Sequence, residues 1–316
     1  MGTPAPASRA MIVTALLVLY LLWGATYLGM RWAVEGIPPF LMTSARFFLA
    51  GAFMYAVLRI GGASRPTGVD WFRSGIISLC LMVGGNGGVA YSEQYISSGL
   101  AALLLSTVPL WIIVLAWLGG TGPRPTSWIL AGLVIGFFGM FLLVKPGLHF
   151  AGDFSPRGFK GIAAALIAAL VWSIGSLYAR RVHLSISPIL AVAMQMLQAS
   201  VVLLMMACLT QETAAFDYHR LTGRAMGAFV FLVVAGPIGF TAYVWLIRVC
   251  APSLVTTYAF VNPVIAMGLG WALAGESITG SMLMGAACLV AGVAMVVMGQ
   301  PAAAPAKELT EKESPL

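Results

Sequence analysis

Residues 23–31 read WGATYLGMR, and residues 172–180 read WSIGSLYAR. Three pairs of identical residues stand 149 positions apart in these stretches and just beyond them: Trp23/Trp172, Arg31/Arg180 and Pro39/Pro188. Three further pairs of like residues stand 154 positions apart: Tyr91/Trp245, Leu100/Leu254 and Pro109/Pro263. An insertion of five residues reconciles the two registers, so the sequence predicts two copies of one unit.

The composition indicates that lipid surrounds most of this chain. Of its 316 residues 60% are hydrophobic and only 9% are charged, against roughly 25% charged in soluble proteins. A membrane-spanning helix needs about 20 apolar residues. Ten segments qualify, separated by short gaps rich in glycine and proline: 10–33, 39–60, 72–91, 97–118, 127–145, 159–179, 188–209, 224–247, 253–274 and 281–299.

The repeat and the segments together predict the architecture. Each copy holds five spans, an odd number, so the second copy enters the membrane from the opposite side. We therefore expect an all-α polytopic membrane protein with ten transmembrane helices in two inverted five-helix repeats, an arrangement common in secondary transporters. The expected divisions are residues 8–148, residues 157–300 and a disordered cytoplasmic tail at 301–316.

Lysine and arginine give the expected orientation. With the N-terminus inside, ten of the 17 basic residues lie on the inner side, six lie outside and Arg46 lies within a span. Basic residues are retained on the cytoplasmic side. The count therefore predicts that both termini are cytoplasmic in a bacterial inner membrane, although the loop from Lys145 to Lys160 argues the other way.

Other function classes find little support in the sequence. No basic cluster with interleaved aromatic residues indicates nucleic acid. The four cysteines lie in apolar runs and the three histidines lack ligand spacing, so we expect no metal and no cofactor. No GxxxxGK[ST] motif is present, so any drive must come from an ion gradient or the substrate's own gradient.

Several motifs resemble the EamA family of the drug/metabolite transporter superfamily. They are WGATY at 23–27, ARF at 45–47, GNG at 85–87, SGLAA at 98–102, TVP at 107–109, YAFVNP at 258–263 and GE at 275–276. The resemblance covers about residues 10–300 and is nearest to inner-membrane exporters. It implies ten helices and efflux of amino acids, related metabolites or drugs. One departure is that an acid common after the fourth helix is replaced here by Leu118-Gly119-Gly120.

Charged groups at membrane depth are the first functional candidates, since they must find a partner or face a cavity. Arg46 lies in the middle of the second span and either binds a substrate carboxylate or forms a structural ion pair with Glu93 or Glu35. Glu93 follows the third span and either titrates in a proton-coupled cycle, holds a gate, or is a solvated or paired acid. Glu276 is expected to make a helix-end or loop contact.

Breaks in the helices supply further candidates. Asn86 stands among four glycines and is expected to line a cavity or to bond a neighbouring helix. Asn262-Pro263 is its analogue in the second half, and Pro109 interrupts the fourth span. We expect both prolines to shape the cavity or to take part in gating, with Thr107 beside Pro109 as a binding group.

Aromatic residues complete the predicted substrate site. Trp23, Tyr27, Trp172, Tyr243 and Tyr258 lie in repeat-related spans, where they either stack on a small substrate or belong to the interfacial belt. With Arg46, Asn86, Thr107 and Asn262 they form the expected binding set.

The favoured function is a secondary transporter that exports small metabolites, most of all amino acids, by alternating access. Efflux of cationic drugs is the main alternative, and a membrane-embedded transferase or a channel is a minor one. The expected partners are the substrate and membrane lipid, with proton coupling left open, no nucleic acid, and a monomer compatible with the sequence. The chain is not expected to be an enzyme.

Overall fold

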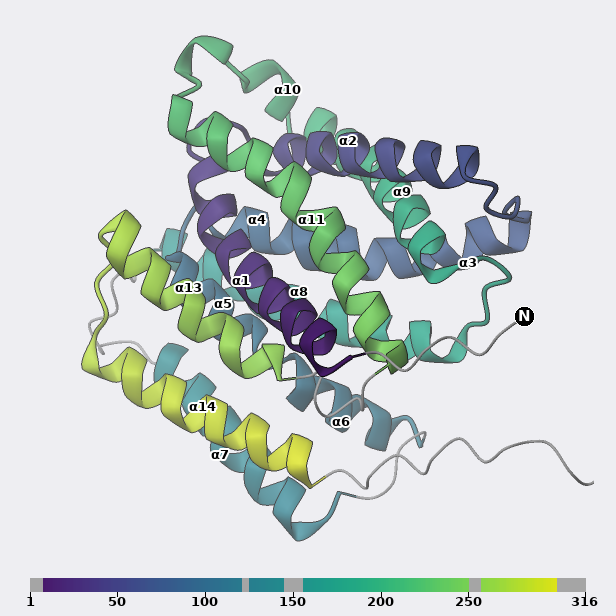
Figure 1. Ribbon diagram of the computed structural model, residues 1–316. Coiled ribbons are helices and arrows are strands. Elements are labelled where there is room, and N and C mark those ends of the chain that lie inside the picture. The colour runs from purple at the N-terminus through teal and green to yellow at the C-terminus, as the bar shows by residue number, and fades with distance from the viewer. Residues whose placement is uncertain (1–7, 121–124, 145–155, 250–256, 300–316) are drawn as a thin grey trace, which may run out of the picture.

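The structure is a computed structural model that describes residues 8–120, 125–144, 156–249 and 257–299, and these residues hold no strand. Helices follow one another from end to end (Figure 1). The first half contains α1 (Arg9–Ala33), α2 (Pro39–Ile60), α3 (Gly68–Ser78), the π-helical η1 (Leu79–Gly87), α4 (Gly88–Ser92), α5 (Ser98–Leu105), α6 (Val108–Leu118) and α7 (Ser127–Val144). The second contains α8 (Pro156–Arg181), α9 (Pro188–Leu209), α10 (Glu212–Ala215), η2 (Tyr218–Arg220), α11 (Gly223–Val249), α13 (Tyr258–Ala274) and α14 (Gly280–Met298).

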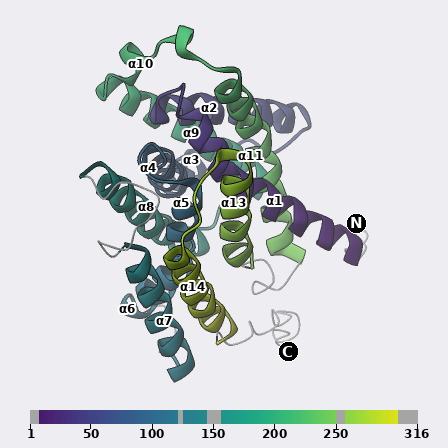
Figure 2. The ribbon, with the colours of Figure 1, turned by 90° about the vertical axis from the view of Figure 1, so that its left-hand side faces the viewer.

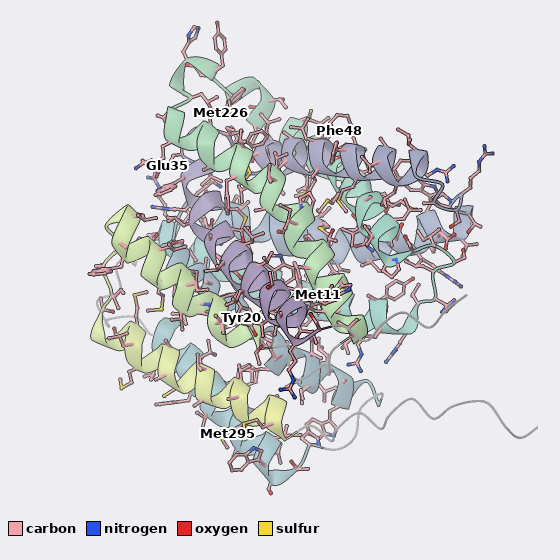
Figure 3. The ribbon with its side chains drawn as sticks, in the orientation of Figure 1. Met11, Tyr20, Glu35, Phe48, Met226 and Met295 are labelled. Carbon is pink, nitrogen blue, oxygen red and sulfur yellow. The ribbon has the colours of Figure 1, made fainter. Side chains whose placement is uncertain are left out.

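The expected all-α membrane fold is confirmed. Among the described residues, seven continuous helical segments are long and apolar enough to cross a bilayer, and three further apolar helices are shorter. Large apolar side chains cover the outside of the bundle: Phe48 is 56% exposed and Phe53 70% exposed on α2, and Figure 3 shows Phe48 at the outer rim. The short helices leave the count of ten crossings a prediction, and the predicted tail lies outside the described residues.

Local signals set the helix ends. α2 and α9 begin at the predicted Pro39 and Pro188, where the fixed backbone angle of proline suits the first helical turn. α3 begins at Gly68, earlier than predicted, because Thr67 and Asp70 form a capping box. There the Thr67 hydroxyl accepts from the Asp70 amide at 3.2 Å, and the Asp70 carboxylate accepts from the Thr67 amide at 2.9 Å.

The helices pair between the two halves about a pseudo-two-fold axis. The most extensive contacts join α7 with α14, α2 with α9, and α1 with α11, and Figures 1 and 2 both show α7 beside α14. Other contacts come in symmetry-related pairs. The contact of α1 with α11 is equivalent to the contact of α8 with η1 and α4. The contact of α1 with α13 is equivalent to the contact of α8 with α6. Such an exchange of partners is what inverted repeats require.

Matched atomic contacts support the same axis. A Cβ added at Gly239 would lie 2.5 Å from the indole Nε1 of Trp23, and one added at Gly85 would lie 2.4 Å from the indole Cε3 of Trp172. Gly85 and Gly239 stand 154 positions apart, and the tryptophans 149. Each tryptophan therefore rests on a glycine of the other half, which is the two-register relation found in the sequence.

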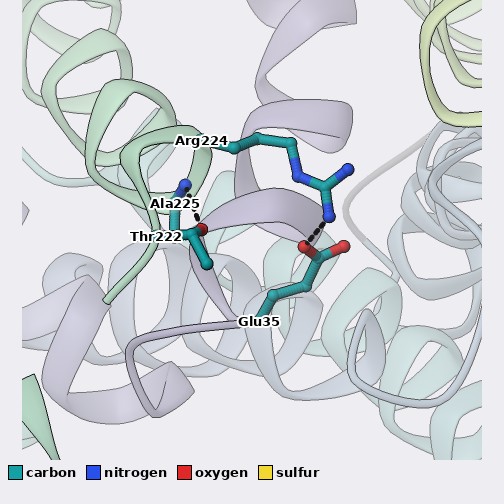
Figure 4. Close-up of polar contacts among 4 residues, drawn as sticks. All are labelled: Glu35, Thr222, Arg224 and Ala225. Carbon is teal, nitrogen blue, oxygen red and sulfur yellow. Dashed lines mark hydrogen bonds and ion pairs between the residues drawn. The ribbon is translucent and has the colours of Figure 1, made fainter. Parts of the chain in front are cut away.

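The bundle has two ends, which we name by their helix termini. Face A is the end at which α1, α3 and α9 begin, and face B is the end at which α1 and α4 finish and α2, α5 and α11 begin. At face B, Glu35 forms an ion pair with Arg224 (Figure 4). The carboxylate of Glu276 accepts from the Ser98 amide at 2.9 Å, the helix-end contact that the sequence predicted.

We expect Gly292→Ala to destabilise the protein, because a Cβ at Gly292 would lie 2.4 Å from the backbone nitrogen of Gly136 where α14 meets α7. Overpacking of this kind costs roughly 1–3 kcal/mol. The apparent melting temperature in detergent should fall. Gly280→Ala is the matched control on α14, because its Cβ would meet nothing within 4 Å. Equal melting temperatures for the two variants would contradict the tight α7–α14 contact.

Candidate substrate site between the two halves

A cavity of about 100 Å³ lies between the halves. Helices of both repeats form its wall: α1, α2, η1, α4, α5 and α6 from the first half, and α8, α11 and α13 from the second. The lining residues are Trp23, Thr26, Tyr27, Met30, Arg46, Phe47, Asn86, Val89, Ala102, Leu105, Ser106, Val108, Pro109, Trp172, Gly236, Phe240, Tyr258, Asn262 and Pro263. Most of this wall is apolar or aromatic, as is usual for a site that takes a small organic molecule.

Irregular helices bring backbone and polar groups to the cavity. The glycine-rich η1 forms a π-helix instead of the simple bend expected, and α5 ends at Leu105 before α6 resumes at Val108. Pro109 lies in the first turn of α6, and Pro263 lies inside α13. Non-helical backbone survives at membrane depth only where protein or a cavity satisfies it.

Arg46 is the charged residue of the wall, 4% exposed. Its Nη2 donates to the Asn86 side-chain oxygen at 3.1 Å and contacts the Met30 sulfur at 3.6 Å. The guanidinium also lies 4.6 Å from the centre of the Phe47 ring. Within the described residues Arg46 forms no ion pair, so the structural ion pair with Glu93 or Glu35 is wrong. Glu35 lies at face B, where it pairs with Arg224 instead.

Asn86 serves both of its predicted roles. It lines the cavity, and its side-chain oxygen accepts from Arg46 on the neighbouring helix α2. Its amide nitrogen donates to the carbonyl oxygen of Leu81, within η1, at 3.1 Å. That bond turns the opposite end of the side chain toward Arg46. The π-helical turn therefore orients the Asn86 amide, and the Asn86 amide in turn holds the Arg46 guanidinium in place.

Among the described residues, two buried polar atoms of the wall have no hydrogen-bond partner: Nε of Arg46 and the side-chain oxygen of Asn262. An unpaired buried group costs about 1–3 kcal/mol. One of these atoms is a donor on a cation and the other is an acceptor. The wall thus offers a ligand both signs of polarity.

Aromatic rings cover one side of the cavity. The ring centre of Trp23 lies 5.4 Å from that of Phe240, 5.3 Å from that of Tyr243 and 5.1 Å from that of Tyr258. Tyr243 therefore supports the wall from behind and does not line it. Trp172 lines the cavity from the other half.

Other predicted site residues lie away from the wall. Thr107 is fully buried, and its hydroxyl donates to the Leu104 carbonyl oxygen at 2.6 Å. Glu93 also lies off the cavity and is fully buried, and in the described part of the chain neither of its carboxylate oxygens has a hydrogen-bond partner. Arg31 donates to the backbone carbonyl of Glu93 and, at 3.3 Å, to that of Ile96.

Phe240 is a lining residue that the sequence reasoning missed. It stands 154 positions after Asn86, so the second register of the repeat points to it directly. Met30, Phe47 and Val89 carried no such signal, because apolar residues are everywhere in these helices.

Comparisons with known proteins agree with this architecture. The model of the EamA-like transporter family matches residues 10–145 and again 159–298. The chain belongs to the EamA-like transporter family. It is 34% identical to the "uncharacterized inner membrane transporter YedA" of Escherichia coli K12, over 90% of each chain.

Two less similar proteins also match over nearly the whole chain. The "uncharacterized transporter YoaV" of Bacillus subtilis is 26% identical, over 90% of this chain and 96% of that one. A solved structure titled "Crystal structure of protein" is 22% identical and superposes with a TM-score of 0.61 over 92% of this chain and 99% of that chain, which shows a shared fold. The chain is therefore a membrane transporter of the drug/metabolite transporter superfamily.

We expect Asn86→Leu to lower stability, because it removes the oxygen that accepts from the Arg46 guanidinium. The loss should be about 1–3 kcal/mol, read as a lower apparent melting temperature. Asn86→Asp should lose less than Asn86→Leu, since a carboxylate still accepts from Arg46 but cannot donate to the Leu81 carbonyl. Asn262→Leu is the matched control, because it removes an acceptor that has no partner and should leave stability equal or higher. A loss at residue 262 as large as that at residue 86 would contradict these assignments.

Proposed function

We propose that this transporter exports small zwitterionic metabolites, foremost neutral amino acids, from the bacterial cytoplasm by alternating access. Family membership supports a transporter, and the cavity between two inverted halves supports alternating access. The inner-membrane name of the relative YedA supports the location. The wall of the cavity supports the substrate class.

The observation that carries the proposal is the guanidinium of Arg46. It is buried at the wall of the cavity, has no ion pair within the described residues, and keeps an unpaired Nε. A carboxylate is the group that arginine binds best, through paired and charge-assisted hydrogen bonds. The substrate proposed here supplies the missing anion.

The other wall suits the ammonium group of the same molecule. Asn262 offers an unpaired acceptor oxygen. The rings of Trp23, Tyr27 and Tyr258 line the cavity beside it, and ring faces attract cations. A zwitterion therefore finds a cationic anchor at one end and acceptors at the other.

The size of the cavity favours a small substrate. It measures about 100 Å³, against about 150 Å³ for a known apolar cavity that holds benzene. An amino acid such as leucine needs a somewhat wider cavity than this one, and multi-ring cationic drugs need a much wider one. The aromatic wall keeps drug efflux as the second candidate, for a state in which the cavity is wider.

The direction of transport depends on how the protein is oriented in the membrane. Basic residues of the sequence favour face A as the cytoplasmic side. An apolar groove opens on that face between α1 and α11 on one wall and α2 and α9 on the other. A cytoplasmic opening suits an exporter, which loads its substrate from inside.

The decisive test is counterflow in proteoliposomes with labelled L-leucine, competed by leucinamide and by N-acetyl-leucine. Wild-type protein should exchange leucine, and each capped analogue should compete at least 10-fold more weakly, since a lost hydrogen bond to a charged group is worth about 1.5–3 kcal/mol. Arg46→Gln should erase the preference for leucine over leucinamide. Asn262→Leu should erase the preference over N-acetyl-leucine.

Thr213→Ala is the control, since Thr213 lies at α10 away from the cavity. Both site variants must first match wild-type elution and melting behaviour. Exchange of a cationic dye such as ethidium without any amino acid would replace this proposal with drug efflux. Equal competition by all three leucine compounds would remove Arg46 and Asn262 from recognition.

We also propose that Glu93 binds the proton in a coupled cycle. Burial raises the pKa of its carboxyl well above the ordinary range, while Arg31 and Arg46 lower it and Glu276 raises it. The neutral form is therefore favoured in this conformation. A conformation that exposes Glu93 to water would return its pKa toward about 4.3 and release the proton.

The pH dependence follows from that sign. A carboxyl whose folded pKa is raised binds its proton more tightly when folded, so stability falls as pH rises above the unfolded pKa. Glu93→Gln should therefore raise the apparent melting temperature at alkaline pH and have no effect near pH 4. In counterflow it should flatten the pH profile of exchange. Glu35→Gln, at an exposed ion pair, is the control, and an unchanged profile in Glu93→Gln would end the proton assignment.

A further inference from the structure

Two stacked rings lie at face B. The ring centres of Phe40, at the start of α2, and Tyr91, near the end of α4, lie 5.8 Å apart with an angle of 9° between the planes. The two helices belong to the first half, and α9 and α8 pack behind them. The stack therefore bridges the seam between two helix pairs, α2–α9 and α4–α8.

The counterparts of these rings lie at face A. Ile189 stands 149 positions after Phe40, and Trp245 stands 154 positions after Tyr91. Both line the groove of about 710 Å³ at that face. Ile189 packs against the apolar cluster of α2 and α9, whereas Trp245 packs against a separate cluster around Leu16 and Leu246. They therefore stand on opposite walls.

A second pair repeats the pattern one layer deeper. A Cβ added at Gly87 would lie 2.9 Å from the Leu203 side chain, so η1 touches α9 near face B. The counterparts of these residues in the two registers are Thr241 and Met54. Both line the groove at face A. Figure 3 shows Met11, another residue of the groove, at the start of α1.

Two contacts that are made at face B thus have counterparts that line an apolar groove at face A. The fold is symmetric about its pseudo-two-fold axis, but these two ends differ. Exchanging the conformations of the two halves would bring Ile189 onto Trp245 and separate Phe40 from Tyr91. The closed contact at face A would then be an aliphatic side chain on an indole, in place of the two stacked rings at face B.

We propose that Phe40–Tyr91 and Ile189–Trp245 are the two gates of this transporter, and that each pair closes when the other opens. The inference rests on the alternating-access part of the proposed function, but not on the identity of the substrate. It assigns the closed gate to face B and the open gate to face A in this conformation.

Paired cysteines test the gates. In a background with the four native cysteines replaced, Phe40→Cys/Tyr91→Cys and Ile189→Cys/Trp245→Cys are each treated with a short bifunctional methanethiosulfonate. Thr26→Cys, which lines the cavity, reports access to a membrane-impermeant thiol reagent added from either side of the liposome after cross-linking. When residues 40 and 91 are cross-linked, Thr26→Cys should react at least 10-fold faster with reagent added at face A than at face B. When residues 189 and 245 are cross-linked, Thr26→Cys should react at least 10-fold faster from face B.

The matched control is Ile129→Cys/Gly299→Cys, which joins α7 to α14 where a Cβ at Gly299 would lie 2.8 Å from Ile129. Cross-linking this pair should change neither access nor leucine counterflow, whereas either gate lock should stop counterflow until it is reduced. Labelling that ignores the locks, or a 189–245 pair that never cross-links in active protein, would overturn the gates. Correct labelling without amino-acid exchange would instead sink only the substrate assignment.

A milder variant keeps the proposal falsifiable if the cysteine pairs misfold. Tyr91→Ala should weaken the closed gate and raise the reactivity of Thr26→Cys from face B. Phe53→Ala removes an equally large ring from the lipid-facing side of α2, where it is 70% exposed, and should change nothing. Equal reactivity in both variants would overturn the gate at face B.

Discussion

A polar group inside a bilayer has no water to bind, and the rest of this structure follows from that constraint. Regular helices satisfy their own backbone, so most of the chain consists of uninterrupted helix. The departures are concentrated at the cavity: the π-helix η1, the break between α5 and α6, and Pro263 in α13. At the first two of them a side chain binds the backbone: Asn86 donates to the Leu81 carbonyl at 3.1 Å, and the Ser173 hydroxyl donates to the Val108 carbonyl at 3.2 Å. The irregular backbone and the cavity therefore lie together in this bundle.

The two halves can approach closely because glycines stand where their helices meet. Side chains larger than hydrogen at Gly85 or Gly239 would collide with the indole of Trp172 or Trp23. The tryptophans can therefore lie flat against the opposite half while lining the cavity. Carboxylates then fasten the helix ends across the seam: Glu212 accepts from the Phe40 and Leu41 amides, both at 2.9 Å. An acid at a helix N-terminus satisfies amides that the helix itself leaves free.

Much of this fold could be predicted from the sequence, because hydrophobic length and proline position are local properties. The bounds of α2 and α9 agree with their predicted segments to the residue. The 149-residue register paired Trp23 with Trp172, and both line the cavity, which was one of the two roles open to them. The partner of Arg46 could not be predicted. Acids at nearby depth were the expected partners, yet Arg46 donates to the Asn86 side chain instead. The position of Asn86 depends on a π-helical turn, which glycine content alone does not specify. Thr107 failed to reach the cavity for a similar reason, since its hydroxyl bonds its own helix.

The cavity wall is where the symmetry of the fold ends. Trp23 and Trp172 are equivalent, but the counterpart of Arg46 is Gln195 and that of Asn86 is Phe240. The first half presents Arg46 and Asn86 to the cavity, whereas Phe240 lines it from α11 and Gln195 is not among the lining residues. A symmetric scaffold suits the exchange of conformations, because both states then use the same kind of packing. An asymmetric lining suits an asymmetric ligand, since it fixes which end of the molecule faces which half. A transporter of two inverted halves needs both, and the differences between the halves at the positions of Arg46 and Asn86 are the ones that give the cavity a direction.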